Sequence, residues 1–167
     1  MVHPDGRLLI DQVRPATGER LNVTTTAVGA DGRIAARNTN YGANLSPEVS
    51  WSAASGARAW ALALEDPDAP TPEPFVHWLM WNIPPGVTRL AEGKAPPGVA
   101  LGRNDAGGVG YWGPRPPSGT HRYHFEVFAL SSPLPLGPGA DRDALVAALR
   151  GRVIAEGETT GLASPPR

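Results

Sequence analysis

Cysteine is absent from the 167 residues, and neither sign of charge is in clear excess. Without cysteine there is no disulfide framework, no thiol nucleophile and no cysteine-ligated zinc site. The 15 Lys and Arg residues face 16 Asp and Glu residues, which gives a formal net charge of -1. A general nucleic-acid-binding protein needs a basic excess, so we expect no nucleic-acid partner.

Long apolar runs are also lacking. No stretch approaches the roughly 18 apolar residues that a membrane-spanning helix needs. The first ten residues include Pro4, Asp5 and Arg7, which do not fit the apolar core of a signal peptide. No basic amphipathic helix is evident either. We therefore expect a cytoplasmic protein without stable membrane insertion.

Glycine and proline are abundant, with 20 and 19 residues. Both interrupt helices, so the composition favours a mostly β protein with structured turns. The length predicts one domain over residues 1–167, which is large enough to bury a core without metal or disulfide support. The oligomeric state stays open between monomer and homodimer.

Three segments have the alternation typical of strands: Ala57–Glu65, Phe75–Ile83 and His121–Leu130. The first is apolar on both faces, which predicts a central position in a sheet. In the second, strict alternation places Phe75, His77, Leu79, Trp81 and Ile83 on one face. In the third, it places His121, Tyr123, Phe125 and Val127 on a buried face, opposite a polar face of Arg122, His124 and Glu126.

The remaining segments give weaker signals. Strands are predicted at Arg7–Val13 and Leu21–Val28, and Asp31-Gly32 reads as a turn. The four prolines within 67–74 predict a stiff loop, in which one X-Pro bond is a candidate for the cis form. Residues 84–120 read as a long connection, and long connections are often functional. Asp141 is a good N-cap for a helix over 142–156, and residues 162–167 are expected to form a loose tail.

A candidate pocket follows from ionisable residues placed among large apolar neighbours. Asp66, His77, His121 and Tyr123 share the face that packs, and burying such groups is costly unless they are paired. One interpretation is purely structural, with Asp66 holding a histidine. The alternative is an anion pocket beside the glycine-rich loop, whose wall would include Trp112 unless that ring covers the sheet edge. Two imidazoles with loop N–H groups suit a phosphate monoester, with modest and pH-dependent affinity.

Other chemistries are less well supported by the sequence. Two histidines and one carboxylate form a metal-binding facial triad in some proteins, but no local ligand spacing is present here. A hydrolase is a further alternative, although no G-x-S-x-G motif occurs. The run Gly108-Val-Gly110-Tyr-Trp-Gly113 matches a dinucleotide fingerprint, yet prolines follow at once and prevent the helix that such a site requires. We therefore expect no metal, no cofactor and no catalytic residue.

Four motifs together resemble the phosphatidylethanolamine-binding protein family, closest to its bacterial Raf kinase inhibitor-like branch. They are Asp66-Pro-Asp-Ala-Pro70, Val76-His77-Trp78, Gly110-Tyr-Trp-Gly-Pro-Arg-Pro-Pro117 and His121-Arg-Tyr123. Their order and spacing make the resemblance specific. It is strongest over residues 40–157, whereas residues 1–35 match only loosely and no tyrosine lies near the chain end.

The resemblance implies a large central β-sheet flanked by a smaller sheet and a few helices. It also implies a surface pocket for phosphate-like groups, including phospholipid head groups, and no shared enzymatic reaction. The candidate ligand-binding residues are Asp66, Asp68, His77, Gly113, Pro114, Pro116, His121 and Tyr123. The alternative is a protein-interaction module that inhibits a kinase or protease, since some eukaryotic members of the family bind and inhibit protein kinases. The exposed proline-rich segments 67–74 and 114–117 motivate that alternative.

Overall fold

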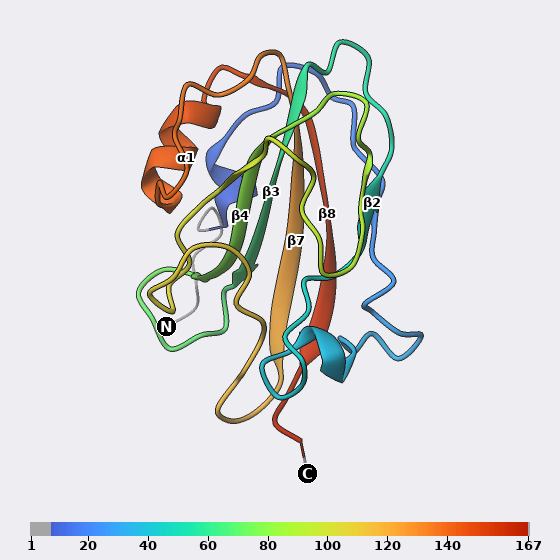
Figure 1. Ribbon diagram of the computed structural model, residues 1–167, viewed down its shortest axis with the longest axis vertical. Helices are drawn as coiled ribbons and strands as arrows, with labels where there is room; N and C mark the ends of the chain where they lie inside the picture. The colour runs from blue at the N-terminus through green and yellow to red at the C-terminus, as the bar shows by residue number, and fades with distance from the viewer. Residues whose placement is uncertain (1–7, 167) are drawn as a thin grey trace.

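The computed structural model describes residues 8–166 and contains two antiparallel sheets (Figure 1). The large sheet has five strands in the order β6 (Ala100–Leu101), β4 (Phe75–Ile83), β3 (Ala59–Asp66), β7 (His121–Leu130) and β8 (Val153–Ala163). The small sheet has the order β1 (Val23–Thr24), β2 (Val49–Trp51) and β5 (Arg89–Leu90). This architecture confirms the predicted β fold, and β3 is central as expected.

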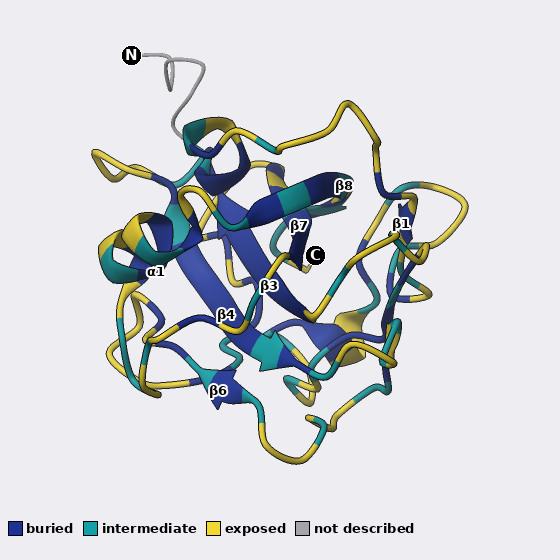
Figure 2. Cartoon of the chain, turned by 90° about the horizontal axis from the view of Figure 1, so that it is seen from above, coloured by how far each residue is buried: buried dark blue, intermediate teal, exposed yellow. Residues whose placement is uncertain are grey.

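The large sheet is covered on both faces. Figure 1 shows helix α1 (Arg142–Leu149) on one side of it and strand β2 of the small sheet on the other. Two short 3-10 helices, η1 (Leu9–Gln12) and η2 (Ala36–Asn38), complete the helical content of the described residues. Seen from above in Figure 2, the long strands are buried and the surrounding loops are exposed. Within residues 8–166, no helix is long and apolar enough to span a membrane.

Each face of the sheet packs its own core. The small-sheet core joins the large side chains of β3 to the small sheet and includes Trp51, Trp60, Leu62, Leu64 and Leu90. The helix-side core joins the alanines of β3 to the helices and includes Leu9, Ala59, Ala61, Ala63, Leu145 and Leu149. Alternation of large and small residues along β3 therefore sets a thick layer on one face and closely packed helices on the other.

Strand β4 has the predicted bounds, but its side chains do not alternate as predicted. Leu64 pairs with Trp78 and Glu65 pairs with Val76, so His77 is an extra residue in β4. A second irregularity lies near Asn82, whose φ of 55° is left-handed. These bulges reverse the faces of the residues between them. The prediction that Leu79 and Trp81 share a face with His77 and Ile83 was therefore wrong: both lie in the helix-side core, whereas Ile83 lies in the small-sheet core.

Strand β7 also has its predicted bounds, but its second face is not solvent-exposed throughout. Glu126 is completely buried. The reason is that η1 lies over this part of the sheet, and the backbone N–H of Ile10 donates to Glu126 Oε1 at 2.8 Å. The half-buried pattern expected for the strand was thus wrong at this residue.

The chain start differs from the predicted strands. Residues of the predicted strand Arg7–Val13 form η1 instead, and Arg7 lies outside the described residues. Of the predicted strand Leu21–Val28, Val23–Thr24 forms a strand and Val28 makes an isolated antiparallel bridge with Ile34. The Asp31-Gly32 turn is confirmed: Gly32 has a φ of 81° and its N–H donates to Gly29 O at 2.9 Å. The described residues contain no cis peptide bond, so the prolines of 67–74 are trans.

The prediction of a helix over 142–156 was wrong beyond residue 149. The helix ends because Gly151 adopts a φ of 81°, a left-handed conformation that favours glycine. The chain then pairs with β7 as strand β8, the longest strand of the structure at 11 residues. Leu162 and Ala163 belong to this strand rather than to a loose tail, and Arg167 lies outside the described residues.

Candidate functional site

A cavity of about 240 Å³ opens where β3 and β4 meet the start of β7. Asp66 ends β3, His77 lies near the start of β4, and His121 and Tyr123 begin β7. The lining residues are Asp66, Ala69, Pro70, Thr71, Phe75, His77, Trp112, Arg115, Pro116, Pro117, His121 and Tyr123. Adjacent antiparallel strands thus bring residues 66, 77 and 121 together although they are far apart in the chain.

Three of the predicted site residues do not line this cavity. Asp68 binds Arg122 instead, with Oδ1 2.8 Å from Nη2 and Oδ2 accepting the backbone N–H at 2.8 Å. The Gly113 N–H donates to Asn44 Oδ1 at 2.7 Å, and Pro114 O accepts the Asn40 N–H at 2.8 Å. These contacts position the loop, and one of them uses the Gly113 N–H, a loop donor that was expected to bind an anion.

Sequence patterns do not decide the role of Trp112, and they do not identify Phe75 or Arg115 as site residues. All three line the cavity. Arg115 could have been identified from the sequence because it lies between the prolines of a recognised motif. Phe75 could have been identified because it follows the same strand alternation as His77.

His77 is held by the loop that faces it. Its Nδ1 lies 2.6 Å from Trp112 O, and its own carbonyl accepts the Trp112 N–H at 2.9 Å. Because a carbonyl oxygen only accepts, Nδ1 carries the hydrogen and Nε2 is the remaining ring nitrogen. Burial, assisted by the nearby His121, lowers the pKa of His77 from its ordinary 6.5 to about 4. The imidazole is therefore neutral at pH 7, and its Nε2 is a hydrogen-bond acceptor.

His121 is held by a carboxylate. Its Nδ1 lies 2.7 Å from Asp66 Oδ2, so the expected contact between Asp66 and an imidazole is present. The other carboxylate oxygen, Oδ1, accepts the Asp68 N–H at 2.8 Å. Burial raises the pKa of Asp66, and the hydrogen bond from His121 opposes that rise. Because Nδ1 of His121 is bonded to Asp66, Nε2 is the remaining ring nitrogen, and it donates a hydrogen bond only when the ring carries both hydrogens.

Tyr123 lies between the two imidazoles. Its ring centroid is 5.3 Å from that of His77 and 6.4 Å from that of His121. The hydroxyl is buried and makes no hydrogen bond of normal length among the described residues, although the Asp66 carboxylate is near enough to attract its hydrogen. Burial and the charge of Asp66 raise the pKa of Tyr123, so the hydroxyl keeps its proton. An unpaired buried donor costs about 1–3 kcal/mol, so a polar partner for this hydroxyl would be stabilising.

The walls of the cavity are mainly apolar. Trp112 stacks on His77 with ring centroids 5.8 Å apart, and Phe75 lies 4.8 Å from the same imidazole. Arg115 brings a positive charge to the lining, with its guanidinium 4.9 Å from the centroid of the Tyr41 ring. An apolar wall around a few polar groups is typical of small-molecule sites and strengthens the hydrogen bonds made inside.

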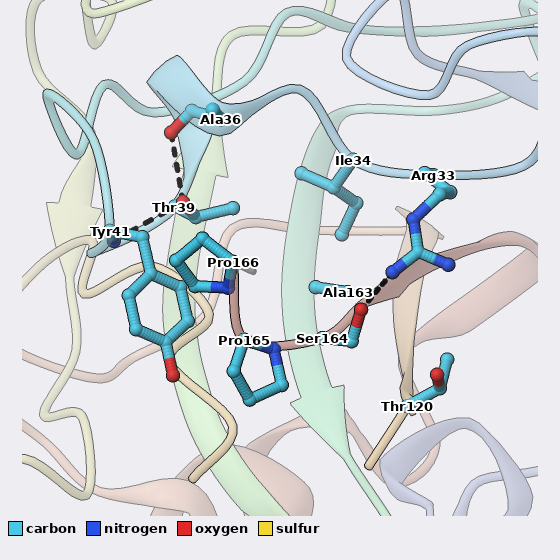
Figure 3. Close-up of a pocket in the computed structure, with 10 residues that line it drawn as sticks. All are labelled: Arg33, Ile34, Ala36, Thr39, Tyr41, Thr120, Ala163, Ser164, Pro165 and Pro166. Atoms are coloured by element: carbon cyan, nitrogen blue, oxygen red, sulfur yellow. Dashed lines mark hydrogen bonds between the residues drawn. The ribbon is translucent and has the colours of Figure 1, made fainter. Parts of the chain in front are cut away.

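A larger cavity of about 630 Å³ lies between η2 and the end of β8 (Figure 3). Most of its polar side chains already have partners within the described part of the protein, Thr120 being the exception. Arg33 binds Ser164, Thr39 Oγ1 donates to Ala36 O at 2.8 Å, and the Tyr41 hydroxyl donates to Pro116 O. The smaller cavity is therefore the better candidate, because only it combines a buried unpaired donor with two imidazoles.

The facial triad considered from the sequence is not formed. In the described part of the chain, no group of three or more His, Asp or Glu side chains is arranged to hold a metal ion. Asp66 and His121 bind each other, and the Nδ1 of His77 is occupied by Trp112. The site is thus a set of hydrogen-bonding groups.

Comparison of the sequence with known proteins identifies a family to which it is similar. The family model described as phosphatidylethanolamine-binding protein matches residues 24–164. A UPF0098 protein of Methanothermobacter thermautotrophicus is 43% identical over 148 residues, covering 85% of this chain and 97% of the relative. One of Pyrococcus abyssi is 38% identical over 154 residues, covering 87% and 86%.

Solved structures agree with the sequence matches. The crystal structure of a putative phosphatidylethanolamine-binding protein homologue from Chlamydia trachomatis has a TM-score of 0.82 at 32% identity, covering 88% of this chain and 99% of its own. That of YbcL from Escherichia coli, described as a new member of the mammalian PEBP family, has a TM-score of 0.82 at 30% identity, covering 89% and 100%. Fold, motifs and relatives lead to one conclusion: the chain belongs to the phosphatidylethanolamine-binding protein family.

Proposed function

We propose that this protein binds small phosphate-type anions reversibly in the cavity between His77, His121 and Tyr123, without transforming them. The observation that carries the proposal is the buried Tyr123 hydroxyl, which makes no hydrogen bond of normal length among the described residues. It lies between two imidazoles whose Nδ1 atoms are occupied, so Tyr123 and the two Nε2 atoms are the groups left for a ligand.

The charge of the site supports an anion of modest size. Asp66 holds Nδ1 of His121, so Nε2 is the ring nitrogen left for a ligand, and it donates a hydrogen bond when the ring carries both hydrogens. Arg115 adds a permanent positive charge to the lining. A cavity of about 240 Å³ accommodates a phosphate with a small organic substituent. The family description, which names a phosphate-bearing lipid, points the same way.

A binding role is favoured over hydrolysis because the lining offers no activated nucleophile. Thr71 supplies a hydroxyl, but that hydroxyl donates to Glu73 O. The Asp66–His121 pair resembles the base half of a hydrolytic triad, yet among the described residues neither histidine is hydrogen-bonded to a serine.

The Tyr123→Phe variant tests the proposal. It is expected to weaken binding of phosphate and phosphoethanolamine about 10- to 100-fold, the range for losing one hydrogen bond to a charged group. Its stability should be equal or higher, because an unpaired buried hydroxyl is removed. Titration of the histidine side-chain NMR signals near pH 6 measures the affinity, and chemical denaturation measures the stability.

The Tyr111→Phe variant is the matched control. The Tyr111 hydroxyl is also buried, but it donates to Asn38 O and does not line the cavity. That variant should lose stability and keep its affinity.

If Tyr123→Phe binds both ligands as tightly as the original protein, the site assignment is wrong. If neither ligand shifts the His77 or His121 signals of the folded protein, anion binding fails and a protein partner becomes the better hypothesis.

A further inference from the structure

The cavity contains a hydrogen-bond acceptor, Nε2 of His77, which an ordinary anion site lacks. The Nδ1–H of His77 is committed to Trp112 O, and the Trp112 N–H is committed to His77 O. Side chain and backbone thus bind the same residue of the loop. Turning the ring over to present Nδ1 would break its hydrogen bond to Trp112 O, so the lone pair of Nε2 is what the imidazole offers to a ligand.

Burial and the neighbouring His121 oppose protonation of that lone pair, and together they outweigh the backbone hydrogen bonds of Trp112 and Gly113, which favour it. The ring is 3% exposed, it is flanked by Phe75, Trp112 and Tyr123, and His121 would add a like charge. The nearest carboxylate of the lining, Asp66, is already bonded to His121 and to the Asp68 N–H. The remaining charged groups around the site are Arg115 at its lining and the mutually paired Asp68 and Arg122.

An oxyanion in this cavity therefore faces two kinds of partner. Tyr123 and a protonated His121 offer hydrogens to its bare oxygens. The oxygen that faces His77 meets a lone pair, and two lone pairs repel unless one of the atoms carries a hydrogen. A phosphate or phosphomonoester monoanion has both kinds of oxygen, since it keeps one acidic proton until about pH 6.

We propose that His77 makes the pocket selective for phosphate or a phosphomonoester that retains one acidic proton, over oxyanions of similar shape that have none. This inference rests on the proposed anion-binding function and makes it more specific. His77 acts here as a specificity-determining acceptor, while Tyr123 and His121 supply the attraction common to all such anions.

The decisive comparison is methyl phosphate against methyl sulfate at about pH 5.5. Both carry close to one negative charge and have the same shape, but only methyl phosphate has an acidic hydrogen. We expect methyl phosphate to bind at least tenfold more tightly, as measured by calorimetry and by histidine NMR titration. In the complex, the ¹⁵N shift of His77 Nε2 should remain that of an unprotonated nitrogen.

The His77→Gln variant should remove the discrimination, because a carboxamide both donates and accepts. Its methyl phosphate to methyl sulfate affinity ratio is expected to approach one, mainly through tighter binding of methyl sulfate. If this variant does not fold, the ligand pair and the ¹⁵N shift in the original protein still decide the question.

Equal affinities for the two ligands, or an imidazolium at His77 in the complex, would overturn the selectivity while leaving anion binding intact. Failure of both ligands to bind, or binding that is insensitive to Tyr123→Phe, would instead mean that the proposed function itself is wrong. The two failures are therefore distinguishable.

Discussion

Replacing Arg142 with methionine is expected to lower the free energy of unfolding by about 3–5 kcal/mol at pH 7, as is typical when a buried ion pair loses one partner. Arg142 Nε lies 2.6 Å from Glu65 Oε1, and the two side chains are 8% and 0% exposed. Glu65 Oε2 also accepts the Leu9 N–H at 2.7 Å. Methionine keeps much of the packing volume, so the loss arises from the carboxylate left without its counter-charge. Chemical denaturation gives the value.

An exposed ion pair provides the matched comparison. Arg122 Nη2 lies 2.8 Å from Asp68 Oδ1, with the side chains 58% and 26% exposed. Arg122→Met should therefore cost about 1 kcal/mol or less. The double variant Glu65→Gln, Arg142→Met should recover part of the loss, because no unpaired charge remains buried. Equal losses in the two single variants would contradict the interpretation.

The Glu126→Gln variant is expected to lose much of the pH dependence of stability above about pH 5. Glu126 is completely buried, and its Oε2 has no hydrogen-bond partner among the described residues. Burial and the adjacent Glu65 raise the pKa of Glu126 well above its ordinary 4.5. The folded protein therefore keeps a proton that the unfolded chain releases. Glutamine carries hydrogens in place of that proton and still offers an oxygen to the Ile10 N–H.

The sign follows from proton binding. Above the unfolded pKa the folded state binds more protons, so stability falls as pH rises, by about 1.4 kcal/mol per pH unit for one retained proton. This loss continues until the pH reaches the raised pKa of the folded state. Chemical denaturation at several pH values should show a steep slope for the original protein and a shallower one for Glu126→Gln.

Neighbouring titratable groups also contribute to the slope of stability against pH. The difference in slope between the original protein and Glu126→Gln is therefore the quantity that reports on Glu126. Titratable and charged groups around Glu126 come from every element packed there: Glu65 of β3, His124 of β7, Glu156 and Glu158 of β8, Asp11 of η1 and Arg142 of α1. Burial raises the pKa of Glu156 to about 7, which acts in the same direction. The lowered pKa of His77 acts in the opposite direction between about pH 4 and pH 6.5.

The exposed Glu19→Gln variant is the control, and an unchanged slope in Glu126→Gln would mean that Glu126 is ionised when folded.

Sequence patterns located the strands well where alternation was strong. The bounds of β4 and β7 and the central place of β3 follow from runs of apolar residues between turn-forming segments. The bulge at His77 was not predictable, because one extra residue in a strand leaves the local composition unchanged. The helix was predicted too long because Val153 continues the four-residue spacing of Leu145 and Leu149 past Gly151.

The main side chains of the candidate site were predictable from the sequence, whereas the hydrogen-bond partners of its loop were not. Ionisable residues among large apolar ones identify Asp66, His77 and His121, and the structure brings them together. The use of the Gly113 N–H depended on Asn44, which lies 69 residues earlier in the chain. Such distant partners have no local signature. The burial of Glu126 escaped prediction for the same reason, because η1 covers it from the other end of the chain.

The paired contacts between His77 and Trp112 couple the shape of the pocket to its chemistry. One segment supplies an aromatic wall and also fixes which nitrogen of the imidazole carries hydrogen. Lifting that wall frees Nδ1 and lets water reach the ring, so an open pocket accepts a proton more easily than a closed one. By linkage, a ligand that brings its own proton to Nε2 favours the closed wall, and a ligand without one favours the open wall. Closure of the loop and the protonation state of the bound ligand are thus linked, and each shifts the equilibrium of the other.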